Sequence, residues 1–293
     1  LFRSARRQVW LDLDNDFSDH NFSPSAGPYT DWCLDQQTNS ESDLSNLFAS
    51  IGDVVLPAKS NSQTPVAQNP PTNQIGGTIS GELGVWGRND IYHVTDDLIV
   101  PAGETLTIAA GTTLIFSPNQ QMVVAGQLLA DGNTVYPIRF TSFDTAGWDG
   151  ITVQASAVDS WCTGCYIENI QAGGVALRID GPMSIRTSRI RNVPGGTAIL
   201  STVPVDLSHT IIDFVDTGIH LVGSPAQTHV YPHLTIIRCE HALVNEGHTL
   251  TLDNSIITTC SEAVSTKLAG QTTVNYTLFD SNGQNFITEA GSQ

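Results

Sequence analysis

The sequence predicts an all-β fold, a right-handed parallel β-helix of about nine or ten rungs that follows an irregular N-terminal extension. Two observations lead to this prediction. A phrase recurs at an interval of about 22 residues, as in TIIRCEHALV at 235–244 and SIITTCSEAV at 255–264. The repeats consist of short β-branched segments broken by Gly, Asn, Asp and Pro, which is the pattern of strands and turns and not of helices.

One aliphatic residue marks each repeat and serves as its anchor. The anchors are Ile167, Ile190, Ile212, Ile236, Ile257 and Leu278, at spacings of 23, 22, 24, 21 and 21 residues. Three positions later, the alignment predicts an inward column of Ile170, Val193, Val215, Cys239 and Cys260. Successive rungs of a parallel solenoid lie one strand spacing apart, about 4.8 Å, so residues at equal offsets stack on each other. The repeat therefore predicts which side chains meet between rungs.

A polar residue stands three positions before most anchors, at an expected bend between strands. This column consists of Thr187, His209, His233, Asn254 and Asn275. Such side chains can hydrogen-bond along the stack and satisfy backbone groups that a turn leaves open. Two stacked imidazoles could share a metal ion, but a zinc site needs three or four ligands. We therefore expect a hydrogen-bonding ladder at His209 and His233.

Before residue 160 the rhythm changes to one strand and one corner per eight residues. Leu98, Leu106, Leu114 and Met122 follow this spacing and predict the first rungs. The domain organisation that we expect is an N-terminal extension at 1–56, a Pro-rich linker at 57–77 and the β-helix at 78–293. The extension is expected to contain one strand near its start and a short helix in its second half.

Composition limits the classes of function. The chain has 29 acidic and 12 basic residues, a net charge of −17, so no nucleic-acid partner is expected, because phosphate binding needs a basic face. No apolar run in the sequence is long enough to span a membrane. Since the chain begins with Leu1 and shows no signal peptide, we expect a piece of a longer precursor.

Five cysteines indicate an oxidising environment, outside the cell or at its surface, with one thiol left over. Cys239 and Cys260 are expected about 5 Å apart at Cα, within the range of a disulfide, and both a bridge and two stacked thiols are open. Cys162 and Cys165 form CTGC without the surroundings of a redox or zinc motif, so a structural disulfide or simple burial is expected. Cys33 is the odd thiol and a candidate partner for either of them.

Four aspartates lie close together in the segment DLDNDFSD. They are Asp12, Asp14, Asp16 and Asp19. A hard cation such as calcium needs several oxygen ligands, and a DxDxD loop supplies them. An EF-hand loop also needs Gly at its sixth and Glu at its twelfth position, and this chain has neither. A polar strand end is the favoured interpretation, calcium is the alternative, and no other cofactor is expected.

Two groups of charged residues are candidates for catalysis on a carbohydrate. The first is Asp144, Asp149 and Asp159, and the second is Glu168, Arg191 and Asp213. Trp148 and Trp161 lie near the first group and could stack on sugar rings. Polysaccharide lyases and hydrolases need such sets of carboxylates and bases. The second group, one residue after the anchors, is also explained as a ladder of cross-strand ion pairs.

Four phrases, in this order, resemble a known family. Trp86, VPAGETLTIAAGT at 100–112, PIRFTS at 137–142 and GWDGI at 147–151 are similar to the opening rungs of the secreted and cell-surface right-handed parallel β-helix repeat proteins of bacteria. The resemblance covers residues 78–287. It implies the fold and its first rungs but names no activity, because this fold hosts adhesins, structural proteins and polysaccharide enzymes.

These observations lead to two hypotheses on function. The first is a non-catalytic extracellular structural or adhesive protein, whose partners are other copies of itself or a cell-surface polysaccharide. The resembling family closes its last rung with a segment that this chain lacks, so an open end could pair head-to-tail with the next subunit and form filaments. The alternative is a carbohydrate-active enzyme, a polysaccharide lyase or hydrolase with carboxylates on one face of the β-helix.

Overall fold

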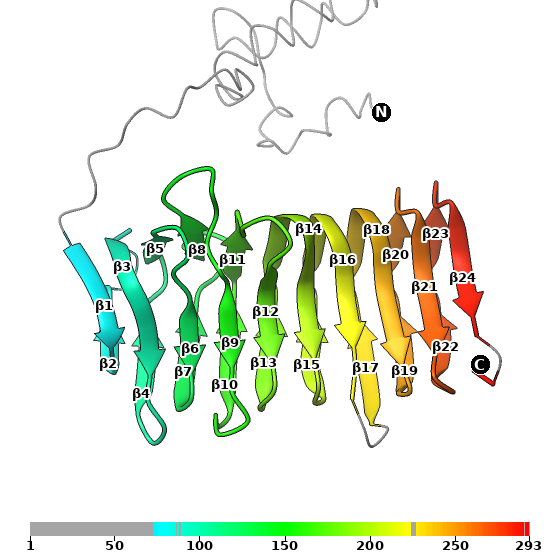
Figure 1. The fold of residues 1–293 in the computed structure, drawn as a ribbon, viewed down its shortest axis with the longest axis horizontal. Coiled ribbons are helices and arrows are strands. Elements are labelled where there is room, and N and C mark those ends of the chain that lie inside the picture. The colour runs from blue at the N-terminus through cyan, green and yellow to red at the C-terminus, as the bar shows by residue number, and fades with distance from the viewer. Residues whose placement is uncertain (1–72, 86, 88, 224–226, 290, 293) are drawn as a thin grey trace, which may run out of the picture. The chain divides into compact units, whose positions relative to one another are not determined.

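The computed structural model describes residues 73–85, 87, 89–223, 227–289 and 291–292. The regular structure of these residues consists of strands alone, which stack in parallel as a β-solenoid of about ten turns (Figure 1). The predicted all-β parallel solenoid is confirmed. The strand and helix expected within 1–56 lie outside the described residues. The first strand, β1 (Asn73–Thr78), begins inside the range 57–77 that the sequence predicted to be linker.

Each turn runs over three faces. Face 1 consists of β2 (Gly81–Leu83), β4 (Thr105–Ile108), β7 (Gln127–Asp131), β10 (Ser160–Thr163), β13 (Met183–Arg186), β15 (Val205–Ser208), β17 (Thr228–Pro232), β19 (Thr249–Asp253) and β22 (Gln271–Asn275). Face 2 contains β5 (Thr113–Phe116), β8 (Ile138–Ser142), β11 (Cys165–Glu168), β20 (Ile256–Thr258) and β23 (Leu278–Asp280). Face 3 contains β6 (Met122–Val124), β9 (Ile151–Val153), β12 (Val175–Ile179), β21 (Glu262–Lys267) and β24 (Gln284–Thr288).

Five strands cross the corner between faces 2 and 3 and join these faces into one bent sheet of 15 strands. They are β1, β3 (Ile91–Val100), β14 (Arg189–Ser201), β16 (Ile211–Leu221) and β18 (Thr235–Glu246). The first half of β3 pairs with β5 and its second half with β6, which shows how one strand serves two faces. The alternation of side chains along every strand places one set inside the coil and the other on the surface.

The predicted inward column is present in the core. Ile170, Val193, Val215, Cys239 and Cys260 are all buried. Val215 is paired with Val193 on one side and with Cys239 on the other. The eight-residue rhythm of the first rungs is also confirmed, because Leu98, Leu106, Leu114 and Met122 are fully buried in strands β3, β4, β5 and β6.

The predicted alignment is wrong by one residue in the last rung. Ile257 pairs with Phe279, and Leu278 pairs with Ile256 and points outward, 56% exposed. Likewise Asp253, not Asn254, pairs with Asn275. A slip of one residue exchanges the two sides of a strand, and only the pairing with the previous rung decides whether Leu278 or Phe279 packs against the core.

The polar column occupies the corner between faces 1 and 2, as expected of a bend. Thr187, His209, His233 and Asn254 all have positive φ, between 47° and 59°. Asn and His are among the residues that tolerate this left-handed conformation, which explains their choice. The rings of His209 and His233 stack at 4.6 Å. Each backbone N–H of this column donates to a carbonyl one rung on, as from His233 N to Asp253 O at 2.9 Å. The side chains are therefore not needed to satisfy these backbone groups, which was the role expected of the side-chain ladder.

The phrase GWDGI is a folding motif. Trp148 is fully buried, stacks on Phe116 at 4.1 Å and donates its indole N–H to the Glu168 carbonyl at 3.0 Å. Gly150 has φ +85° and lies so close to the next rung that a Cβ would come within 2.1 Å of Val175 O. A side chain is therefore excluded at Gly150 by conformation and by space.

Candidate functional site

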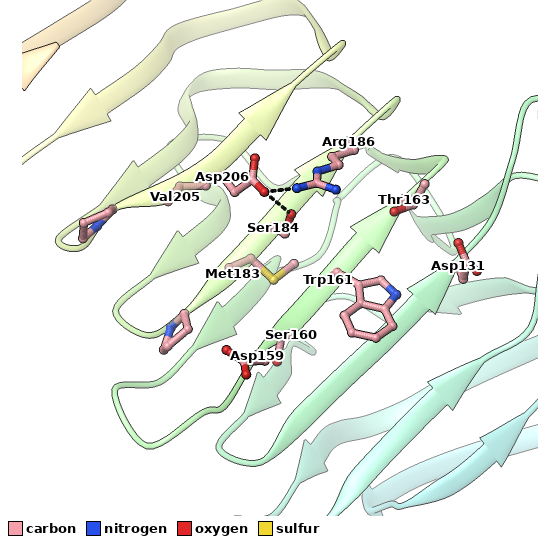
Figure 2. Close-up of a pocket in the computed structure, with 12 residues that line it drawn as sticks. Asp131, Asp159, Ser160, Trp161, Thr163, Met183, Ser184, Arg186, Val205 and Asp206 are labelled. Carbon is pink, nitrogen blue, oxygen red and sulfur yellow. Dashed lines mark hydrogen bonds and ion pairs between the residues drawn. The ribbon is translucent and has the colours of Figure 1, made fainter. Parts of the chain in front are cut away.

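An open groove of about 750 Å³ lies on the outside of face 1, across strands β7, β10, β13 and β15 (Figure 2). Its lining is mixed, with one aromatic ring, three carboxylates, one guanidinium and several small side chains. The lining residues are Asp131, Asp159, Ser160, Trp161, Thr163, Pro182, Met183, Ser184, Arg186, Pro204, Val205 and Asp206. A shallow groove along stacked strands suits an extended ligand better than a small enclosed one.

Strand pairing places the outward side chains of the groove in two parallel columns. The first runs Leu129, Trp161, Ser184 and Asp206. The second runs Asp131, Thr163, Arg186 and Ser208. The residues between them, such as Cys162 and Ile185, point into the core and are fully buried. The hydrophobic core thus fixes which residues of these strands face outward.

Trp161 is the aromatic centre of the groove. It is 37% exposed, although the residues on both sides of it, Ser160 and Cys162, are buried. The Ser160 hydroxyl accepts from Leu128 N at 3.0 Å and donates to Val158 O at 2.9 Å, which holds the start of β10 in place. An indole on a rigid strand offers a flat apolar surface at little cost in conformational entropy, and a sugar ring can stack on such a surface.

Polar groups surround the Trp161 ring and can bind hydroxyl groups. Arg186 forms an ion pair with Asp206, and Ser184 donates a hydrogen bond to the same carboxylate at 3.1 Å (Figure 2). Asp131 and Asp159 lie on other sides of the groove, and Gln127 donates to the Asp159 carbonyl at 2.9 Å. Carboxylate oxygens accept and guanidinium groups donate, so this set can satisfy both kinds of hydrogen bond that a sugar hydroxyl makes.

The three aspartates of the first catalytic candidate group, Asp144, Asp149 and Asp159, occupy separate places. Only Asp159 lines the groove. Asp144 accepts from Ala146 N at 2.8 Å in an exposed turn. Asp149 lies between two core residues, and burial, followed by the charge of Asp97, raises the pKa of its carboxyl. Trp148, which the sequence suggested as a sugar platform, is buried and cannot be one. The first group is therefore no single site.

The second group is a set of ion pairs on face 2, and its partners differ in part from the prediction. Glu168, Arg191 and Asp213 occupy adjacent rungs at the same offset, as predicted. Arg191 contacts Glu168 at 3.6 Å. Asp213, however, is held by Arg189 at 3.0 Å and Arg238 at 2.6 Å and not by Arg191. Long side chains reach diagonally across the sheet, which equal offset alone does not predict.

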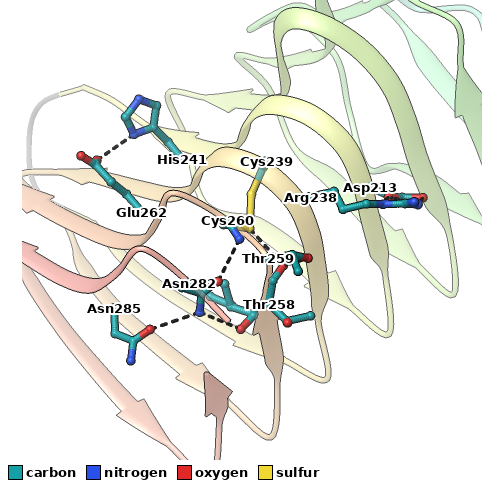
Figure 3. The surroundings of a disulfide bond; sticks show 11 residues. Asp213, Arg238, Cys239, His241, Thr258, Thr259, Cys260, Glu262, Asn282 and Asn285 are labelled. Carbon is teal, nitrogen blue, oxygen red and sulfur yellow. Dashed lines mark hydrogen bonds and ion pairs between the residues drawn. A yellow bond between two sulfur atoms is a disulfide. The ribbon is translucent and has the colours of Figure 1, made fainter. Parts of the chain in front are cut away.

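The structure divides the cysteines into a bonded pair and a free pair. Cys239 and Cys260 form a disulfide with Cα atoms 4.6 Å apart (Figure 3). Cys162 and Cys165 are free and fully buried, and burial raises the pKa of the Cys165 thiol. CTGC is therefore a core segment here. Cys33, the third candidate, lies outside the described residues.

The calcium candidates Asp12, Asp14, Asp16 and Asp19 also lie outside the described residues. Within the part that the structure describes, no group of three or more His, Cys, Asp or Glu side chains could hold a metal ion. Over the same residues, no helix has the length and apolar character that crossing a bilayer requires.

Sequence reasoning missed most of the groove. Asp131, Ser184, Arg186 and Asp206 were not singled out, although the repeat contains a signal for three of them. Ser184 and Asp206 follow Trp161 at the spacing of the rungs, and Arg186 follows Thr163, so the alignment that predicted the inward column could have predicted these outward columns too. Asp131 carries no such signal, because the chain between β7 and β10 is longer than a later repeat.

Comparisons with known proteins assign no family to the chain. No family model matches it. A segment of 75 residues is 36% identical to Protein bark beetle of Drosophila melanogaster, and this segment is 26% of the chain and 2% of that protein. No solved structure matches. The chain thus spans a small fraction of the relative's length, and the resemblance to the bacterial cell-surface family remains an expectation.

Proposed function

We propose that this protein is a non-catalytic extracellular β-solenoid of the structural or adhesive kind, which binds polysaccharide in the groove at Trp161. The observation that carries the proposal is the exposed indole of Trp161 on a flat sheet, framed by Asp131, Asp159 and the Arg186–Asp206 pair. An aromatic surface with polar groups at its edges matches a sugar, which has an apolar ring face and hydroxyl groups at its rim. The disulfide is compatible with an extracellular location.

The candidate catalytic residues support a binding role. Glycosidases use two carboxyl groups about 5 to 9.5 Å apart, one of which acts as an acid with a raised pKa. Here the aspartate with the raised pKa, Asp149, belongs to the turn before β9 on face 3, away from the groove. Asp206 is already engaged by Arg186 and Ser184. A polysaccharide hydrolase or lyase is the second candidate, favoured by the position of Asp131 and Asp159 in one groove with Trp161.

The adhesive role includes head-to-tail assembly of copies of this chain. In the last described turn, Leu278 is 56% and Phe286 is 54% exposed. Exposed apolar side chains on neighbouring strands can pack against another copy of the chain. Static light scattering over a range of concentrations tests this: a mass that grows with concentration and falls in Leu278→Lys supports assembly, and a constant monomer mass contradicts it.

Binding of polysaccharide is tested by titrating the full chain with immobilised neutral and acidic polymers. We expect Trp161→Ala to weaken binding by about tenfold or more, since loss of one well-placed contact surface is worth roughly 1.4 kcal/mol. The matched control is Phe214→Asn, which removes an exposed aromatic ring on another face. Equal affinity of Trp161→Ala and the parent chain would contradict the proposal.

The same samples separate binding from catalysis. New reducing ends or unsaturated sugar products that appear with the parent chain, and disappear in Asp131→Asn/Asp159→Asn, would establish the enzyme and overturn the non-catalytic proposal. Polymers of unchanged length after prolonged incubation, together with Trp161-dependent binding, would support it.

A further inference from the structure

Four arginines gather on the outer side of face 2, although the whole chain has 12 basic against 29 acidic residues. They are Arg139, Arg189, Arg191 and Arg238. Two carboxylates, Glu168 and Asp213, lie among them, so four positive charges face two negative ones. We call this set the arginine cluster. A positive patch on a protein of net charge −17 indicates an anionic ligand for this part of the surface.

The two carboxylates of the cluster differ in how fully they engage the arginines. Asp213 accepts hydrogen bonds from Arg238 at 2.6 to 2.9 Å and from Arg189 at 3.0 Å, and its side chain is only 3% exposed. These donors are directed at Asp213, so this half of the cluster holds the sheet together. An added anion would have to compete with a buried and well-bonded carboxylate.

Glu168, in contrast, leaves its two arginines with donors to spare. Its Oε2 atom lies 3.7 Å from Arg139 and 3.6 Å from Arg191, which are ion-pair distances longer than a hydrogen bond. The side chains of Arg139 and Arg191 are 42% and 44% exposed, whereas the side chain of Glu168 is 13% exposed. Each guanidinium has five N–H donors. Two exposed guanidinium groups thus converge on one point and can receive a carboxylate or sulfate from solution.

The surroundings add a second kind of contact. The Cζ atom of the Arg139 guanidinium lies over the Tyr166 ring, 4.7 Å from its centroid, a cation–π contact. Arg139 pairs with Tyr166, which pairs with Arg189, and Glu168 pairs with Arg191. With Asp213 on β16 and Arg238 on β18, the cluster extends over five adjacent strands, β8, β11, β14, β16 and β18. A flat arrangement of charges over successive rungs suits a linear polymer that carries an anion on its repeating units.

The cluster and the groove adjoin along the chain. Strand β10 of the groove leads through Gly164 into β11, and β13 leads through the corner at Thr187 into β14. Arg186 of the groove and Arg189 of the cluster therefore flank one corner of a single rung. From this we propose that the arginine cluster binds the carboxylates or sulfates of an acidic polysaccharide, which deepens and rests on the function proposed for the Trp161 groove.

The test uses pairs of polymers that differ only in charge, with the full chain as the binding protein. Polygalacturonate is compared with its fully methyl-esterified form, and dextran sulfate with dextran. We expect Arg139→Gln/Arg191→Gln to bind at least one charged polymer about tenfold more weakly and its neutral form as before, since a charge-assisted contact to an anion is lost. Arg178→Gln is the matched control, because Arg178 is 45% exposed, pairs with Asp180 and lies on face 3.

Glu168→Gln keeps both arginines and removes the carboxylate that competes with the ligand for them. Because this variant should bind more tightly, its effect cannot come from a loss of folded protein. We expect it to bind the charged polymer several-fold more tightly, with a steeper dependence on salt.

Two results would overturn the inference. In the first, the parent chain binds charged and neutral polymers equally; in the second, Arg139→Gln/Arg191→Gln keeps the affinity of the parent chain for the charged polymers. Poly-L-glutamate bound with the same affinity and arginine dependence would overturn the assignment to polysaccharide. If Trp161→Ala loses binding and the arginine variants do not, this inference alone is wrong. If the arginine variants lose binding and Trp161→Ala does not, the function proposed for the groove is wrong.

Discussion

Cys239 lies one turn before Cys260 in the same inward column, and a disulfide joins them (Figure 3). The bond closes a segment of 21 residues. In the chain-entropy model a crosslink of this length stabilises the fold by about 3 kcal/mol, mainly by restricting the unfolded chain. The bond therefore fastens two neighbouring rungs that backbone hydrogen bonds already hold in register.

Replacement of both cysteines by valine isolates the covalent contribution, because Val193 and Val215 occupy the same column in earlier rungs. We expect Cys239→Val/Cys260→Val to lose about 2 to 3 kcal/mol of unfolding free energy in urea titrations. A reducing agent should lower the stability of the parent chain and leave the variant unchanged. Equal stability of the two proteins under oxidising conditions would contradict the prediction.

His229 predicts a loss of stability in acid. It is 2% exposed, its Nδ1 atom lies 2.9 Å from the Tyr231 hydroxyl, and its ring lies 5.0 Å from the ring of His248. Burial, followed by the charge of His248, lowers the pKa of His229 from 6.5 to about 4. Because the folded pKa is depressed, the unfolded chain binds the proton first, and this part of the stability is complete above pH 6.5 and lost as the pH falls to about 4.

The shift in pKa corresponds to a loss of about 3 kcal/mol of unfolding free energy. His229→Gln should reduce the slope of unfolding free energy against pH between pH 6.5 and 4, measured by urea titration at each pH. His209→Asn is the control, since His209 occupies a left-handed corner that Asn tolerates. An identical slope in His229→Gln and the parent chain would show that folding does not lower the pKa of His229.

Asp213→Asn should destabilise the fold more than Asp206→Asn. Each aspartate pairs with arginine, but Asp213 is 3% exposed with two arginine partners, and Asp206 is 52% exposed with one. Removing the buried charge is expected to cost roughly 2 to 4 kcal/mol, and removing the exposed one less than about 1 kcal/mol. Thermal and urea unfolding of the two variants measure the difference. Similar small losses in both would mean that solvent screens Asp213 as well.

Gly150→Ala should cost more stability than Gly103→Ala. Both glycines have positive φ, +85° and +84°, so the conformational strain is alike. At Gly150 a Cβ would come within 2.1 Å of a backbone carbonyl, whereas at Gly103 nothing lies within 4 Å. We expect about 1 kcal/mol for Gly103→Ala and at least about 2 kcal/mol more for Gly150→Ala, measured as unfolding free energy.

The sequence by itself determined the coil and the order of its core. The spacing of Ile167, Ile190, Ile212 and Ile236 predicts the strand pairs that the structure contains, and the same spacing places Cys239 next to Cys260. A solenoid makes this possible, because contacts between rungs are contacts between residues one repeat apart. The spacing of hydrophobic residues along the chain therefore also indicates which residues are neighbours in the folded structure.

Only the tertiary structure decided which surface groups meet. The length of the chain between β7 and β10 sets where Asp131 lies relative to Trp161, and this length follows no repeat. The reach of flexible arginine side chains decides that Asp213 pairs with Arg189 and Arg238. Spacing along the chain specifies the backbone position of a residue, but the direction and packing of long polar side chains depend on neighbours from several rungs at once, and the groove and the arginine cluster consist of such side chains.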